Sequence, residues 1–153
     1  MPLSKISIRN FRCFDSVELS LSPGINFFYG SNGSGKTSLL EAIFIFSSGK
    51  SFKSSNLAAL VKYNRSKFLL NGYDGTRGDV IEIEKDVNKP IHVLLNNKKI
   101  PSSRLLKKLP CTPIHNSTFS FANAALKARV QQQKQSGYRP CTKLLAWEAL
   151  CHN

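Results

Sequence analysis

The chain has 153 residues, enough for one modest domain with its own core, and 41% of them are hydrophobic, as is ordinary for a soluble protein. No apolar run reaches the roughly 20 residues of a membrane span, and the N-terminus lacks the apolar core of a secretory signal, so we expect a cytoplasmic protein without a membrane partner. The formal net charge of +13, and the absence of any acid between Val87 and Trp147, favour a nucleic-acid partner.

The cysteines are scattered and form no C-x-x-C pair. This usage is typical of reduced thiols in the cytosol rather than of a disulfide framework or a zinc site. Cys141, Cys151 and His152 have a spacing that fits no common zinc site. The cysteines are Cys13, Cys111, Cys141 and Cys151.

The first segment alternates apolar and polar residues over 5–9 and again over 17–21, which predicts a β-hairpin turning at residues 10–16. Arg9 and Arg12 lie at the strand end and the turn. Each is either a solvated surface charge or a donor held near anionic oxygens.

The central stretch reads Gly-Ser-Asn-Gly-Ser-Gly-Lys-Thr over residues 30–37, a match to the Gly-x-x-x-x-Gly-Lys-[Ser/Thr] phosphate-binding loop. Residues 24–29 predict a buried strand before it, and residues 38–46 predict a helix, apolar around most of its surface, that ends at Gly49. The alternative, a flexible Gly/Ser turn, does not explain this strand–loop–helix order. The candidate site residues are Gly30, Ser31, Asn32, Gly33, Ser34, Gly35, Lys36 and Thr37.

The chemistry of a bound triphosphate explains these residue types. Glycines let backbone N–H groups converge on the phosphate oxygens, Lys36 brings a positive charge to the β- and γ-phosphates, and the Thr37 hydroxyl is a ligand for Mg²⁺. The sequence therefore predicts ATP and Mg²⁺ as cofactors.

After the helix, residues 47–56 form a Ser-rich connector carrying Lys50 and Lys53, which is either a solubilising loop or a contact to nucleotide or DNA. Residues 57–61 predict a short helical turn, and residues 102–108 a capped basic one. Residues 68–73, 80–85 and 91–95 predict an antiparallel β meander, with a hairpin turn over 96–99. Glu82 and Glu84 should face solvent from this meander. A last strand is predicted over 111–116, where His115 is more easily explained as a structural residue than as a sensor or base.

The stretch Ile8-Arg9-Asn10-Phe11-Arg12, together with the loop and the text Lys36-Thr37-Ser38-Leu39-Leu40-Glu41-Ala42-Ile43, resembles the N-terminal part of the RecF/SMC group of ABC-type ATPases, and of its RecF branch most. Gly49-Lys50-Ser51-Phe52-Lys53-Ser54 fits the same branch. The resemblance implies an α/β P-loop NTPase fold with an antiparallel β meander.

For function, the resemblance implies ATP-dependent binding of single-stranded DNA and of gapped or duplex junctions. This activity serves recombinational repair, replication restart and the SOS response. The resemblance also implies an ATP-dependent homodimer and RecR and RecO as partners.

The resemblance covers residues 1–123, the expected N-terminal part of a RecF-like ATPase domain, and stops at a basic tail over 124–153. We interpret that tail as the product of truncation or a frameshift. Hydrolysis in this group needs an Asp-Glu pair at a strand end and a Ser-rich signature motif, yet the single acid after Asp86 is Glu148. We assign no catalytic residue, and a half-complete head should leave Phe44, Ile45 and Phe46 exposed.

Two other functions stay open. One is a different phosphate-loop enzyme such as a small kinase, for which Glu41 is the nearest acid and is expected to face away from the loop. The other is a non-hydrolysing fragment that binds nucleotide weakly, or nucleic acid through charge alone.

Overall fold

One antiparallel sheet with a single long helix across it forms the framework of the computed structural model, which describes residues 3–109 and 111. In these residues the six strands follow the order β2-β1-β3-β4-β5-β6. The strands are β1 (Leu3–Phe11), β2 (Phe14–Ser20), β3 (Lys67–Asp74), β4 (Val80–Asp86), β5 (His92–Leu95) and β6 (Lys98–Lys99). The helices are α1 (Lys36–Ser48) and α2 (Leu105–Lys108), with 3₁₀ turns η1 (Leu57–Leu60) and η2 (Ser102–Arg104).

The sheet owes its two faces to the period-two pattern of its strands. Ile6 and Ile8 of β1 are fully buried against α1, whereas Lys5 and Arg9, on either side of this pair in the strand, are exposed on the opposite face. The register places Ile8 opposite Leu70 of β3, so the apolar rows of neighbouring strands coincide. The predicted hairpin and meander are therefore confirmed and form one continuous sheet, but the turn between β1 and β2 takes only Arg12 and Cys13 instead of residues 10–16.

The acids of β4 also lie where the sequence places them. Glu82 and Glu84 alternate with the buried Ile81 and Ile83 and are half-buried on the face away from α1. Lys67 donates from Nζ to Glu84 Oε2 at 3.2 Å. The prediction that Glu82 and Glu84 point away from the core is confirmed.

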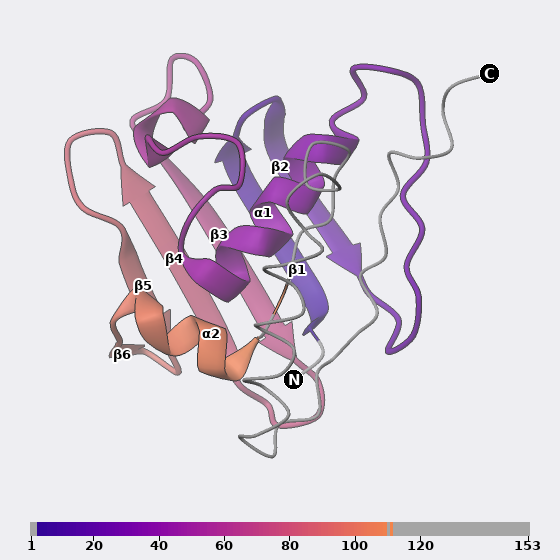
Figure 1. Ribbon diagram of the computed structural model, residues 1–153, viewed down its shortest axis with the longest axis vertical. Coiled ribbons are helices and arrows are strands. Elements are labelled where there is room, and N and C mark those ends of the chain that lie inside the picture. The colour runs from indigo at the N-terminus through magenta and orange to yellow at the C-terminus, as the bar shows by residue number, and fades with distance from the viewer. Residues whose placement is uncertain (1–2, 110, 112–153) are drawn as a thin grey trace, which may run out of the picture.

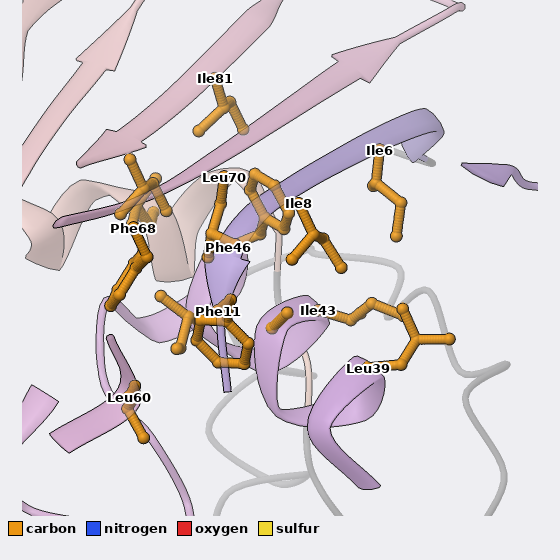
Figure 2. Packing of buried hydrophobic residues seen from close by; sticks show 14 of the residues in the cluster. Ile6, Ile8, Phe11, Leu39, Ile43, Phe46, Leu60, Phe68, Leu70 and Ile81 are labelled. Atoms are coloured by element: carbon orange, nitrogen blue, oxygen red, sulfur yellow. The ribbon is translucent and has the colours of Figure 1, made fainter. Parts of the chain in front are cut away.

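The hydrophobic core fills the space between α1 and the sheet (Figure 2). Phe46 and Ile45 are fully buried, and Phe44 is half-buried with its ring 5.7 Å from that of Phe52 in an edge-on arrangement. The expectation that this end of α1 would be exposed is wrong. The sheet covers one side of the helix, and α2 and the returning loop with Phe52 cover much of the remainder.

Several short elements refine the expected boundaries. The helical turn at Leu57–Leu60 is confirmed as a 3₁₀ turn, and α1 ends at Gly49, whose φ is 65°. The turn between β5 and β6 takes only Asn96 and Asn97, because Lys98 and Lys99 already pair with β5. The predicted cap of the 102–108 turn is wrong, since Pro101 stands at its start and no side chain caps it.

The predicted buried strand over 24–29 is wrong. These residues form no strand pairing with any described residue, and Ile25, Phe27 and Tyr29 expose 49%, 73% and 85% of their surface. The physical reason is that a strand needs a neighbour for its backbone groups, and none of the strands in the described sheet pairs with this segment. In Figure 1 the segment leaves the sheet after β2 and returns to the start of α1.

The antiparallel meander, and the helix α1 that follows the predicted phosphate loop, agree with the expected fold class. Of the predicted strand over 111–116 only Cys111 is described, where its N–H donates to Ser47 Oγ at 3.1 Å. His115, Cys141, Cys151, His152 and the 124–153 tail lie outside the described residues. Within the described part of the chain, no helix has the length and apolar character needed to cross a membrane.

Candidate functional site

The phosphate loop, Gly30–Thr37, lies at the N-terminal end of α1. Ser31, Asn32, Gly33 and Ser34 are exposed, and the residues from Gly35 to Thr37 are half-buried. The Ser34 N–H donates to the Ser31 carbonyl at 3.2 Å, which closes a turn at the outer part of the loop. All eight candidate residues are thus brought together on one exposed edge of the molecule.

Three glycines of the loop, Gly30 with φ 154° among them, have backbone conformations that other residues adopt only with strain. Gly33 has φ 83° and Gly35 has φ 95°. At Gly35 a side chain would also collide, because a Cβ there would lie 2.8 Å from Phe14 Cζ and 2.9 Å from Cys13 Sγ. The loop conformation therefore depends on glycine, most strongly at Gly35.

The start of α1 presents backbone donors that have no acceptor within the helix. The first helical hydrogen bond runs from the Leu39 N–H to the Gly35 carbonyl at 2.9 Å. The N–H groups of Lys36, Thr37 and Ser38 precede it and have no acceptor within the helix. The first turn carries no acidic residue, and no side chain caps it. The helix dipole therefore gives this end a positive electrostatic potential that no acidic side chain of the first turn neutralises. This potential favours an anion, and the backbone N–H groups can donate to phosphate oxygens.

Lys36 points back over the loop. Its Nζ donates to the Gly30 carbonyl at 2.7 Å and to the Ser31 carbonyl at 2.9 Å. The ammonium is therefore held beside the exposed loop backbone, within reach of an anion bound there. Thr37 follows as the second residue of α1, and its hydroxyl is an oxygen ligand of the kind that Mg²⁺ prefers. The described residues contain no group of three metal-ligating His, Cys, Asp or Glu side chains.

Glu41 is excluded as a metal ligand or base for a kinase-type reaction by its contacts. Its side chain is 1% exposed, and it accepts hydrogen bonds from Arg12 Nε at 3.0 Å and Arg12 Nη2 at 3.1 Å. The Ser51 hydroxyl donates to the same carboxylate. Arg12 is thus ion-paired rather than a free surface charge, whereas Arg9 is exposed on the outer face of the sheet.

The basic connector after α1 folds back along the helix as far as Glu41. Ser51 contacts Glu41 in the middle of α1, and its hydroxyl also accepts from the N–H groups of Lys53 and Ser54. A hollow of about 510 Å³ lies over this connector, with Lys50 and Lys53 in its lining. Lys50 follows Gly49 at the C-terminal end of α1, whereas the candidate nucleotide site lies at the N-terminal end of the same helix.

Sequence reasoning missed the contacts that tie the first hairpin to the loop: Arg12 with Glu41, and Cys13 and Phe14 with Gly35. One signal was available. Glu41 is the single charged residue between Thr37 and Gly49, in a helix that is otherwise mostly apolar. A charge so placed is buried at high cost unless a partner neutralises it, which points to a nearby arginine.

Comparison with known proteins agrees with this geometry. A protein family described as an AAA ATPase domain matches residues 1–138. The DNA replication and repair protein RecF of Glaesserella parasuis serovar 5 (strain SH0165) is 56% identical over 72 residues, which are 47% of this chain and 20% of that protein. RecF of Cronobacter sakazakii (strain ATCC BAA-894) is 38% identical over 89 residues, which are 58% of this chain and 24% of that protein. The chain thus spans about a fifth to a quarter of the length of these curated relatives.

Solved structures with a similar fold include RecF and SMC ATPases. A structure of the recombination mediator protein RecF with ATP, in the RecFOR pathway, has a TM-score of 0.65 and 31% identity, covering 71% of this chain and 31% of that chain. A structure from a study of ATP-driven dimerization and DNA-stimulated activation of SMC ATPases has a TM-score of 0.68 at 18% identity. It covers 87% of this chain and 98% of that chain, and the likeness is one of fold.

Proposed function

Because this chain belongs to the AAA ATPase domain family and its N-terminal part is of RecF type, we propose that residues Gly30–Thr37 bind the phosphates of ATP. The observation that carries the proposal is the arrangement at the start of α1. Two left-handed glycines, N–H groups that have no acceptor within the helix and the Lys36 ammonium share one exposed loop, with no acid in the first turn of the helix.

Each residue has a distinct part in this site. The backbone from Gly30 to Gly35 surrounds the phosphates, Lys36 exchanges its two carbonyl acceptors for phosphate oxygens, and the Thr37 hydroxyl holds Mg²⁺. The exchange at Lys36 replaces two neutral acceptors by charged ones, which strengthens its hydrogen bonds.

Hydrolysis is not part of the proposal for these residues. Attack of water on the γ-phosphate needs an acid or amide that orients the water, and the nearest carboxylate on α1, Glu41, is buried and paired with Arg12. We therefore assign nucleotide binding to this part of the protein and assign it no catalytic residue.

In the cell, we propose that the chain acts in the cytoplasm in DNA replication and repair. Its RecF-type sequence supports ATP-dependent binding of single-stranded DNA and of gapped or duplex junctions, with RecR and RecO as partners and an ATP-dependent homodimer. This activity would serve recombinational repair, replication restart and the SOS response. The tail over 124–153 remains a candidate for a non-native reading frame.

The test is thermal unfolding of the full chain with and without millimolar Mg·ATP, because a ligand that binds only the folded state raises the unfolding temperature. We expect a rise for the natural chain and for Lys50→Ala, which removes an exposed lysine remote from the loop. Lys36→Ala should show no rise. An equal rise in Lys36→Ala would contradict nucleotide binding at this loop.

A second function, binding of nucleic acid through charge alone, is favoured by the run from Val87 to Trp147 without acids. Fluorescence anisotropy with single-stranded DNA separates the two. Charge-only binding falls steeply with salt and ignores ATP, whereas binding through the proposed ATP site changes with Mg·ATP and is lost in Lys36→Ala.

A further inference from the structure

We infer that Arg12 and Glu41 are positioning residues for the phosphate loop: their ion pair fixes the turn between β1 and β2 against Gly35, and so holds the loop in the conformation that binds phosphate. The inference rests on the proposed nucleotide binding for its functional meaning. Its structural part, that the pair orders the loop, is separately measurable.

The pair has the geometry of a fixed contact. Arg12 Nε lies 3.0 Å from Glu41 Oε2, and Arg12 Nη2 lies 3.1 Å from Glu41 Oε1, so two parallel hydrogen bonds hold the planar groups together. The Glu41 side chain is 1% exposed and the Arg12 side chain 31%. The Ser51 hydroxyl donates to the same carboxylate, and a buried carboxylate held by these donors has little freedom to move, because reorienting it breaks charge-assisted hydrogen bonds that water cannot replace.

The backbone at Arg12 indicates that its side chain has a specific task. Arg12 has φ 51°, a left-handed conformation that strains residues other than glycine, and that asparagine tolerates better than arginine does. Its N–H donates to the Leu60 carbonyl at 2.8 Å, which fixes the turn from the opposite side. Arginine at this strained position is explained by its contact with Glu41.

The turn transmits this constraint to the loop through its next two residues. A Cβ built on Gly35 would lie 2.8 Å from Phe14 Cζ and 2.9 Å from Cys13 Sγ, so both side chains are packed directly against the Gly35 backbone. Gly35 is the residue before the first helical position, and Glu41 is in the same helix. The pair therefore ties the helix to the turn, and the turn supports the loop where the helix begins.

Arg12 as a direct ligand of phosphate is the competing explanation. The observed contacts favour positioning, because the carboxylate of Glu41 already neutralises the guanidinium and accepts from two of its nitrogens. The two explanations differ in what Glu41 does. A positioning pair acts as a unit, whereas a phosphate-binding arginine is freed when its carboxylate partner is neutralised.

The experiment compares Glu41→Gln, Arg12→Lys and the double variant in the full chain. Val93→Ala is the control, since Val93 is 2% exposed in β5, away from the loop, and its loss lowers stability without touching the pair. The first measurement is the Kd for a fluorescent ATP analogue, at a temperature well below each variant's unfolding transition. The second is amide hydrogen exchange of residues 33–37 without nucleotide.

We expect each single variant to raise the Kd for the analogue about tenfold. The double variant should raise the Kd no more than the more damaging single variant does, because the two residues act through one contact. Exchange at residues 33–37 should become faster in all three variants and stay unchanged in Val93→Ala. If Glu41→Gln binds as tightly as the natural chain, or if the double variant shows the product of both losses, the pair does not position the loop.

The exchange measurement separates this inference from the proposed function. If the natural chain does not bind the analogue but exchange at residues 33–37 is faster in the pair variants, the proposed nucleotide binding is refuted and the ordering role of the pair is supported. Unchanged exchange in Glu41→Gln and Arg12→Lys would overturn the ordering role whatever the affinity. Arg12→Lys keeps the charge and removes the planar fork, so it gives a result even if Glu41→Gln fails to fold.

Discussion

Replacing Gly35 with alanine tests the packing between the first hairpin and the phosphate loop. Alanine at φ 95° incurs backbone strain of about 1 kcal/mol. Its Cβ would also lie 2.8 and 2.9 Å from two ring carbons of Phe14 and 2.9 Å from Cys13 Sγ. Overpacking of this kind costs about 1–3 kcal/mol. The expected loss in the free energy of unfolding is therefore about 2–4 kcal/mol.

Gly33 supplies the matched control. Its φ of 83° is also left-handed, but a Cβ there meets nothing within 4 Å. Gly33→Ala should therefore lose only the strain, about 1 kcal/mol. Subtracting one loss from the other isolates the steric contribution of Cys13 and Phe14.

The assay is urea unfolding followed by circular dichroism, with the free energy extrapolated from transitions of equal slope. Equal slopes show that the variants change stability rather than the compactness of either state. If Gly35→Ala and Gly33→Ala lose the same free energy, the hairpin does not press on the loop, and the geometry proposed for the positioning pair is wrong.

Other predictions concern the core, the pH dependence and the exposed segment. Phe46→Ala should cost about 3–5 kcal/mol in urea unfolding, because the ring is fully buried between α1 and the sheet. Hydrogen bonds from Asn96, the larger cause, and from Lys108 lower the pKa of the Asp79 carboxyl from its usual value of 3.8. The ionised carboxylate therefore stabilises the folded state at pH values above 3.8, and this stabilisation is lost as the pH falls through the lowered pKa of the folded state. The gap in unfolding temperature between the natural chain and Asp79→Asn should therefore shrink as the pH falls from about 5 to about 3. Phe27→Ser should change the free energy of unfolding by less than about 0.5 kcal/mol, since the side chain is 73% exposed, and should reduce self-association in light scattering.

The sheet and the main helix were predictable because local patterns determine them. Alternation in β1 and β4 places Ile6, Ile8, Ile81 and Ile83 on one face, and the structure buries all four. The end of α1 at Gly49 follows from the preference of a left-handed helix stop for glycine. In both cases the signal lies within a few residues of the feature that it predicts.

The contacts that support the candidate site were not predictable in this way, because they join distant parts of the chain. Arg12 and Glu41 are separated by 29 positions. The phosphate loop sequence specifies which atoms should face a phosphate, but it does not specify what holds the loop in place. The single acid in an apolar helix required a partner, and the sequence offered several arginines without choosing one.

The failure at residues 24–29 has a different origin. Ile25, Phe27 and Phe28 have strand-forming side chains, yet a strand is a property of a pair and not of one segment. In its place, the Asn26 side chain holds the preceding turn, accepting from the Ser22 N–H at 2.8 Å and donating to the Ser22 carbonyl at 3.0 Å. The segment is thus fixed at its start by local contacts and carries no sheet partner among the described residues.

This asymmetry bears on how tightly the loop should bind. Among the described residues, the phosphate loop is supported where α1 begins by Cys13 and Phe14, which pack against Gly35, whereas Ile25, Phe27 and Tyr29 in the segment that leads into it are exposed. When only a fraction of molecules holds the binding conformation, the apparent Kd rises by the inverse of that fraction. The leading segment constrains the loop little, so the fraction of molecules in the binding conformation depends mainly on contacts at the helix side. The Arg12–Glu41 pair is the first of these contacts, and it should therefore contribute to nucleotide affinity.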